Sequence, residues 1–367
     1  MFLILGAMAM RASCQAFILD SPHLQENIEK CLYATYACDF NEAEKLQISL
    51  LEEIPHHPAP YFLKALIIYW ENFPLLPDDL LVEDFEKYIE EAIELADKII
   101  DVSPDNLEGI FFDMHARAYR AMFWADNGKP ARVIRDIDNM YRQTLKGIEL
   151  KDKFEEFYFS SGLYNYYIVA YVELHPAYKP LAALFRSGDK ATGLAELKYA
   201  SEISTYLRYE SLLFLSLLEL NYEGNIDRSL EYAALLYNYF PSNIYFTTNY
   251  LITLLYSSNF TVASILNESI PVEKGDYYKM VHYMAEAFMY ENQTGNFLAA
   301  KEFYLKTISK AESLGAIANI YGAIAYAGLS RIAAKENDDK LSRKYSRRSS
   351  TLSSYKFILD YPLSSAR

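Results

Sequence analysis

The polar residues best placed to bind a ligand lie in residues 107–126, which are predicted to form the first helix of a helix pair. Asp113, Arg117 and Arg120 recur at helical spacing, and Trp124 follows Arg120 by four positions. Two arginines beside an aromatic ring could hold a carboxylate or an acidic peptide, because a guanidinium donates paired hydrogen bonds. The alternative is internal, since Asp113 and Arg117 are an i, i+4 pair that could stabilise only their own helix. The sequence does not decide between the two.

Aromatic residues are concentrated in a second predicted first helix, residues 157–174, which contains Tyr164, Asn165 and Tyr167. An asparagine inside so aromatic a helix must find hydrogen-bond partners if it is buried. Asn165 therefore either ties the helix to a neighbouring segment or faces a ligand. Asn221 and Tyr222, at the end of another first helix (residues 207–221), are similar candidates, although turn chemistry explains them as well. Tyrosine suits an interface, because it offers apolar area and a hydroxyl at small entropic cost.

Metal and catalytic chemistry find little support. His56 and His57 are adjacent in a proline-rich loop, but no third ligand stands beside them. The chain has no nucleophile-elbow, phosphate-loop or dinucleotide motif. Neighbouring carboxylates such as Glu52 and Glu53 point apart on a helix. We therefore expect no cofactor, no metal site and no catalytic residues.

The elements that must position these residues are marked by a recurring spacing. A small residue is followed twelve positions later by a proline in three places, Ala43–Pro55, Ala92–Pro104 and Ser229–Pro241. A small residue lets two helices approach closely, and a proline ends the second helix before the next unit begins. The pattern is typical of the second helix in a repeated helix pair.

Composition limits the fold class. The chain has 367 residues, of which 51% are hydrophobic and 15% aromatic, with 33 tyrosines but only 13 glycines and 13 prolines. Long regular elements rich in Leu and Ala predict an all-α fold. Cys31 and Cys38 are seven residues apart, about 10 Å on a helix, which is too far for a disulfide.

Charge argues against nucleic acid as a partner. The net charge is −14, whereas nucleic-acid binding needs a cationic footprint. One stretch, residues 340–356, is basic and contains Arg343, Lys344, Arg347 and Arg348. We interpret it as a solvated helix face. The alternative is a contact for an acidic partner or for an anionic membrane surface, which would make the protein a peripheral membrane protein.

The first sixteen residues differ from the rest. Phe2 to Met10 is apolar but too short to span a bilayer, Arg11 interrupts it, and Ala16 is a small residue suited to cleavage. The segment is similar to a secretory signal peptide without its basic start, and the alternative is a simple apolar N-terminal helix. We expect a signal peptide at 1–16, an α-solenoid at 17–335 and a C-terminal basic helix that packs as a cap at 336–367. No transmembrane span is expected.

The segments at 38–58 and 223–243 resemble tetratricopeptide repeats, whose units of about 34 residues place small residues at helix crossings and a proline after the second helix. The resemblance covers most of residues 22–335. An insertion at 72–82 interrupts the period. The resemblance implies an α-α superhelix of about six or seven helix pairs.

A second resemblance lies in the middle of the chain. It consists of Ser161 to Tyr167, Lys179-Pro180-Leu181, Gly188-Asp189 with Gly193-Leu194, and Glu210-Ser211-Leu212. This block is similar to one in exported bacterial tetratricopeptide-like proteins and, distantly, to a mitochondrial outer-membrane-associated branch.

The resemblance implies a non-enzymatic scaffold of the bacterial envelope, periplasmic or outer-membrane-associated, that binds a protein or peptide in its concave groove. Two alternatives stay open. One is a carbohydrate-processing or other envelope enzyme, which would need paired carboxylates converging in an aromatic cleft. The other is a cytosolic or outer-mitochondrial adaptor.

Overall fold

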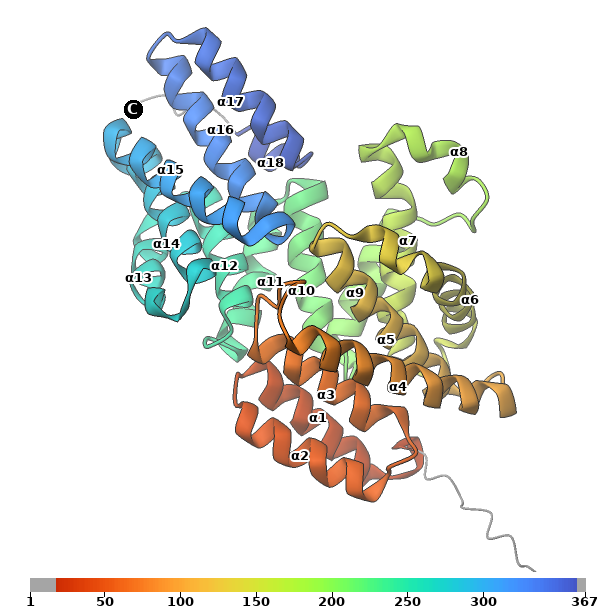
Figure 1. The fold of residues 1–367 in the computed structure, drawn as a ribbon. Coiled ribbons are helices and arrows are strands. Elements are labelled where there is room, and N and C mark those ends of the chain that lie inside the picture. The colour runs from red at the N-terminus through yellow and green to blue at the C-terminus, as the bar shows by residue number, and fades with distance from the viewer. Residues whose placement is uncertain (1–17, 362–367) are drawn as a thin grey trace, which may run out of the picture.

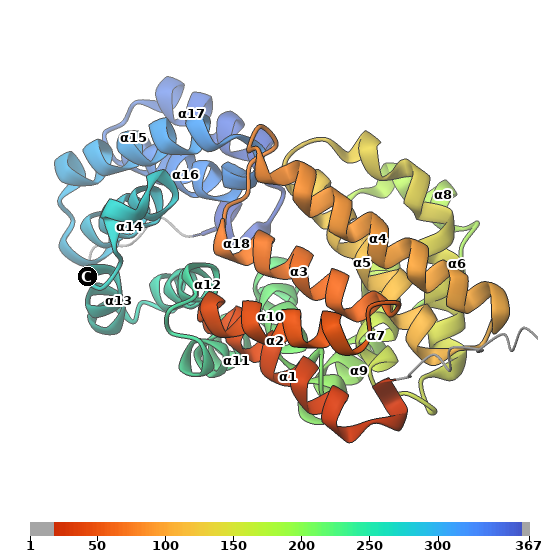
Figure 2. The same ribbon diagram turned by 60° about the horizontal axis from the view of Figure 1, so that its bottom comes forward.

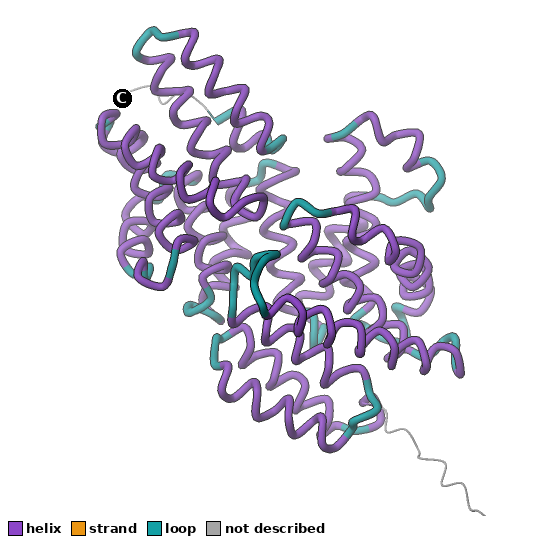
Figure 3. Tube along the Cα trace, in the orientation of Figure 1, coloured by secondary structure: helices purple, strands orange, loops and turns teal. Residues whose placement is uncertain are grey.

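The chain folds into a superhelix built from antiparallel helix pairs (Figure 1). The computed structural model describes residues 18–361, and within them every regular element is helical (Figure 3). The predicted all-α superhelix is therefore confirmed. The predicted signal peptide lies outside the described residues.

Successive helices pack against each other in pairs along the chain. The pairs are α1 (Pro22–Tyr36) with α2 (Phe40–Glu53), α3 (Pro58–Glu71) with α4 (Leu81–Val102), α5 (Leu107–Asp126) with α6 (Ile134–Leu150), α7 (Phe157–Leu174) with α9 (Lys190–Ile203), α10 (Arg208–Leu218) with α11 (Ile226–Tyr239), α12 (Ile244–Tyr256) with α13 (Phe260–Glu268), α14 (Asp276–Met289) with α15 (Phe297–Leu314), and α16 (Asn319–Lys335) with α17 (Asp339–Leu352). Two short helices, α8 (Lys179–Ala182) and α18 (Lys356–Leu359), are added to this series.

The helices begin and end where local chemistry requires. The side chains of Ser21, Asp39 and Asn106 each accept a backbone N–H at the start of the helix that follows. The helices α2, α4 and α11 end two residues before Pro55, Pro104 and Pro241, respectively.

The small residues of the recurring spacing lie at helix crossings, as predicted. Ala43, Ala92 and Ser229 are fully buried. The hydroxyl of Ser229 donates to the carbonyl of Ser216 at 2.8 Å, and the hydroxyl of Ser216 donates to the carbonyl of Ser229 at 3.1 Å. Backbone contact of this kind leaves no room for a larger side chain.

The superhelix closes on itself, so that its two halves touch (Figure 2). The loop between α3 and α4 is the insertion that interrupts the repeat period. Its Phe73 packs against Tyr245 of α12 and Tyr277 of α14, with ring centroids 5.2 Å apart in each case. Asn243 at the start of α12 donates to the carbonyl of Tyr36 at 3.3 Å. The insertion therefore connects the two halves of the superhelix, which together form a closed ring of helix pairs.

The basic stretch lies mostly on α17, the outer helix of the last pair. Ser349 fixes this helix by donating to the carbonyl of Ala323 on α16 at 2.9 Å. The side chains of Arg343, Lys344 and Arg347 are exposed, which agrees with the interpretation as a solvated face. The chain then turns inward, and α18 buries Ile358.

Cys31 and Cys38 are both free thiols.

Candidate functional site

The charged residues predicted to face a ligand instead form an internal ion network among α4, α5 and α6. Arg117 donates to Asp113 at 2.7 Å and to Asp136 at 3.0 Å. Arg120 donates to both carboxylate oxygens of Asp136, at 3.0 and 2.7 Å. Arg120 is only 1% exposed. The structure corrects the ligand-facing interpretation, because internal carboxylates already occupy both guanidinium groups.

Trp124 belongs to the same buried face of α5. Its indole N–H donates to Glu86 of α4, and the guanidinium of Arg132 lies 4.0 Å from its ring centroid. Both its hydrogen bond and its ring face are therefore used within the protein, which corrects its assignment to a partner surface.

The candidates on α7 and in the turn that follows α10 divide into two groups. The Tyr164 hydroxyl donates to the carbonyl of Arg186 at 2.6 Å, and the Asn165 amide donates to Glu196 at 2.9 Å. These two residues tie α7 to the segments that follow it. Tyr167 and Asn221, in contrast, line an internal cavity. Tyr222 lies behind the cavity wall and packs against Tyr167 and Tyr355, with ring centroids 5.7 and 5.6 Å apart.

The cavity has a volume of about 820 Å³ and lies inside the superhelix. Its wall comes from the first helix of every pair, together with the segment after α17. About a third of the residues that line it are aromatic. The aromatic rings that line it are Tyr36, Tyr69, Trp70, Phe73, Tyr119, Phe159, Tyr167, Phe214, Tyr245, Phe246, Tyr277, Tyr321 and Tyr355. A concave, mostly apolar cavity with a few polar groups is the usual form of a ligand site.

One polar cluster in the wall centres on Glu210 of α10. The Tyr36 hydroxyl donates to Oε1 of Glu210, and the Tyr119 hydroxyl lies 3.4 Å from that of Tyr36. The other carboxyl oxygen, Oε2, is buried without a hydrogen-bond partner. Burial raises the pKa of Glu210 to about 7, and the hydrogen bond from Tyr36 offsets part of that shift. The carboxyl group is thus poised to change its protonation state near neutral pH.

A second carboxylate, Asp126 at the end of α5, also lines the cavity. It forms no hydrogen bond or ion pair that would neutralise it within the described residues. Desolvation alone raises the pKa of Asp126 to about 6, although the residue is exposed to the cavity. Burial also raises the pKa of Tyr69, Tyr167 and Tyr245, and the charge of Asp126 adds to each of these shifts. Asp126 therefore lies near several tyrosine hydroxyls.

Among the described residues, the basic side chains that line the cavity are two histidines, His115 and His175. No lysine or arginine is among the described residues that line the cavity. His115 does line it, but burial lowers the pKa of His115 to about 4, so its ring is neutral at pH 7. Its Nδ1–H donates to the carbonyl of Phe111 at 2.7 Å. The cavity therefore contains two carboxyl groups and no lysine or arginine among the described residues that line it.

The residues predicted to meet a ligand lie on the opposite face of α5 from the cavity. The chosen residues Asp113, Arg117, Arg120 and Trp124 each precede by two positions a residue that lines the cavity, namely His115, Tyr119, Met122 and Asp126. Two residues correspond to roughly 200° around a helix. The signal that could have found the inner face is the spacing of His115, Ala118, Tyr119, Met122 and Asp126.

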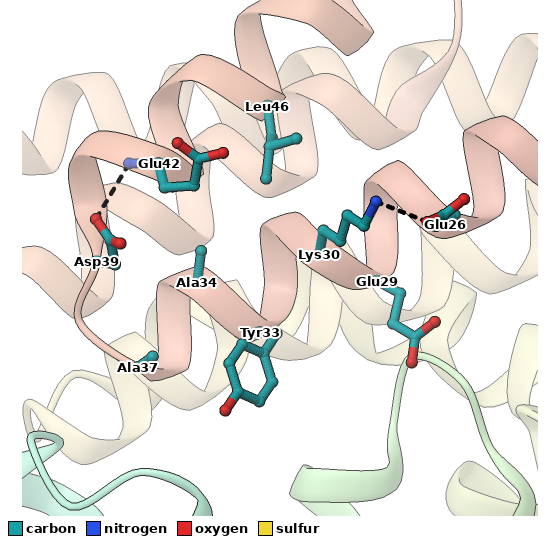
Figure 4. A pocket seen from close by; sticks show the side chains of 9 residues that line it. All are labelled: Glu26, Glu29, Lys30, Tyr33, Ala34, Ala37, Asp39, Glu42 and Leu46. Carbon is teal, nitrogen blue, oxygen red and sulfur yellow. Dashed lines mark hydrogen bonds and ion pairs between the residues drawn. The ribbon is translucent and has the colours of Figure 1, made fainter.

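A shallower depression lies between α1 and α2 (Figure 4). Its charged groups are paired with near neighbours, because Lys30 contacts Glu26 at 2.6 Å and Asp39 accepts the backbone N–H of Glu42 at 3.3 Å. This depression contributes no buried polar atom without a partner. The internal cavity is therefore the stronger candidate.

Residues 18–361 contain no group of three His, Cys, Asp or Glu side chains that could hold a metal ion. His57 caps α3 through Nδ1, and its Nε2 lies 2.7 Å from Glu108. The described helices include none long and apolar enough to cross a membrane.

Fold and site together define an all-α superhelix of helix pairs with an internal cavity that is lined by aromatic rings and two carboxyl groups. No protein-family model matches this chain, and no curated protein matches it.

Proposed function

We propose that this protein is a non-enzymatic binding protein that holds part of a protein or peptide partner in its internal cavity. The observation that carries the proposal is the cavity itself, whose wall extends from Tyr36 to Tyr355 and uses the first helix of every pair. In a helical solenoid this inner surface is the one that meets ligands. Because both ends of the superhelix contribute to the wall, a bound partner would also hold the ring closed.

The bacterial envelope is the proposed location. The short apolar segment at residues 2–10 and the resemblance of residues 161–212 to exported bacterial proteins support it. A cytosolic or outer-mitochondrial adaptor is the alternative, and N-terminal sequencing of the mature protein in its native host distinguishes the two.

A carbohydrate-processing enzyme is the second candidate function. Two carboxylates, Asp126 and Glu210, do line one aromatic cavity, although they are far apart in sequence. Glycoside hydrolysis requires two such groups on either side of the scissile bond. The enzyme hypothesis predicts that the protein hydrolyses an envelope glycan and that both Asp126→Asn and Glu210→Gln abolish this activity.

The binding function is tested by filling the cavity. Ala125 lines it, so Ala125→Trp should abolish capture of the partner from envelope extracts. Ala183→Trp, at an exposed position after α8, is the matched control and should capture the partner as the wild type does. If both variants recover the same partner in equal amounts, partner binding does not use the cavity.

A further inference from the structure

We propose that the cavity receives an alkylammonium group, with the Asp126 carboxylate as its counter-ion and the neighbouring tyrosine rings as its cage. This inference rests on the proposed binding function and assigns a chemical class to the ligand.

Charge is the first argument. Asp126 and Glu210 are the only acidic groups in the wall, and no described lysine or arginine lines the cavity to neutralise them. Asp126 also lacks an ion pair elsewhere among the described residues. Asp126 is exposed to the cavity, so its carboxylate is accessible to a cation that enters there. A cationic ligand supplies the missing charge.

Unpartnered hydrogen-bond acceptors are the second argument. Glu210 is 8% exposed, and its Oε2 is buried without a partner. Oδ1 of Asn221, another wall residue, is also buried without a hydrogen-bond partner. Buried acceptors of this kind are rare in folded proteins and call for a donor. The indole N–H of Trp70 is the one buried donor without a partner among the described wall residues, so two of the three unpartnered atoms are acceptors. An ammonium group has only donors and can satisfy both acceptors.

The aromatic surface is the third argument. Aromatic faces attract organic cations, and cages of several rings are a common way to recognise them. Tyr69, Tyr167 and Tyr245 lie within electrostatic range of Asp126 and line the same cavity. A metal ion would instead need several oxygen or nitrogen ligands together, and no group of three occurs within residues 18–361. The wall therefore favours an organic cation with an apolar body.

The alkylammonium could be the side chain of a lysine in a partner segment or the head of a free amine. Both share the chemistry that the wall recognises. The cavity volume of about 820 Å³ is large enough for either.

The test is calorimetric titration of the full chain with three six-carbon probes that differ only in their head group. Hexylammonium should bind roughly tenfold more tightly than hexanol, and hexanoate should not bind. Asp126→Asn should remove the preference for hexylammonium while leaving hexanol binding unchanged. Asp138→Asn, whose side chain is 82% exposed, is the control and should keep the wild-type preference.

Equal affinity for hexylammonium and hexanol, or a preference that survives Asp126→Asn, would overturn the inference. The inference would also be wrong if no probe bound the protein. If the wild type then still captured a partner that Ala125→Trp did not capture, the proposed binding function would stand without it. A lysine-containing peptide that binds more tightly than hexylammonium, and loses this advantage on Nε-acetylation, identifies the lysine source. Equal binding of the two identifies a free amine.

Discussion

Tyr36 of α1 donates a hydrogen bond to Glu210 of α10, although 174 residues separate them in the sequence. The bond joins the first helix pair to the fifth within the wall of the internal cavity. It also holds one oxygen of a buried carboxyl group while the other stays without a partner. One pair of residues thus takes part in closing the ring and in shaping the site.

Replacing Glu210 should change how stability depends on pH. Its folded-state pKa is raised to about 7, so the protonated form favours folding, and this contribution is lost as pH rises from about 4.5 through 7. Glu210→Gln should remove that loss. We expect the wild type to lose up to about 3 kcal/mol more unfolding free energy than the variant between pH 5 and pH 8.

Urea unfolding at the two pH values measures this difference. Glu231→Gln, on the exposed side of α11, is the control and should follow the wild type. Parallel pH profiles for wild type and Glu210→Gln would contradict the burial of this carboxyl group.

The ion network should be structural. Arg120→Met removes two hydrogen bonds from Asp136, which is 0% exposed, and leaves only the one from Arg117, so it should cost about 2–4 kcal/mol. Arg142→Met removes an exposed i, i+4 pair with Asp138 and should cost less than about 1 kcal/mol. Chemical unfolding gives both values, and similar costs for the two substitutions would argue against the network.

The crossing of α15 and α16 should not tolerate a methyl group. A Cβ added to Gly328 would lie 2.2 Å from Cζ of Tyr304. Tyr304 cannot move freely, because its hydroxyl donates to Glu291 at 2.6 Å. Gly328→Ala should therefore destabilise the protein by about 1–3 kcal/mol. At Gly322 the nearest atom is the flexible end of Leu352, at 3.1 Å, so Gly322→Ala should be close to neutral. Thermal unfolding of both variants beside the wild type measures the difference.

The start of the described chain should depend on Glu108. This buried carboxylate accepts the backbone N–H groups of Ile18 and Leu19, at 3.0 and 2.7 Å, and lies 2.7 Å from His57. Glu108→Ala leaves these groups unpaired and should cost about 2–4 kcal/mol. Glu94→Ala, on the exposed side of α4, should change stability little. Limited proteolysis near residue 18 that is no faster in Glu108→Ala would contradict this anchoring role.

Much of the fold was predictable because it depends on local signals. Proline stops and small residues such as Ala43 and Ser229 gave the helix ends and crossings. The ring closure was not predictable, because it depends on Phe73 meeting Tyr245 and Tyr277 from distant parts of the chain. On the helix itself, the candidate face of α5 was displaced by two residues, which exchanged Asp126 and Tyr119 for Trp124 and Arg117.

Glu210 illustrates a different limit. It was noticed only within a resemblance, since a single acidic residue in an apolar helix has no local pattern that marks it. Its significance comes from Tyr36 and Tyr119, which the superhelix brings to it from two other helix pairs.

The most direct measurement is site-specific photo-crosslinking with a photoreactive phenylalanine analogue at Phe214, which lines the cavity, and at Leu298, which is 80% exposed on α15. We expect one specific cross-linked partner from Phe214 in native envelope extracts and none from Leu298. A partner that cross-links from Leu298 and not from Phe214 would contradict it, because binding would then use the outer surface of the superhelix.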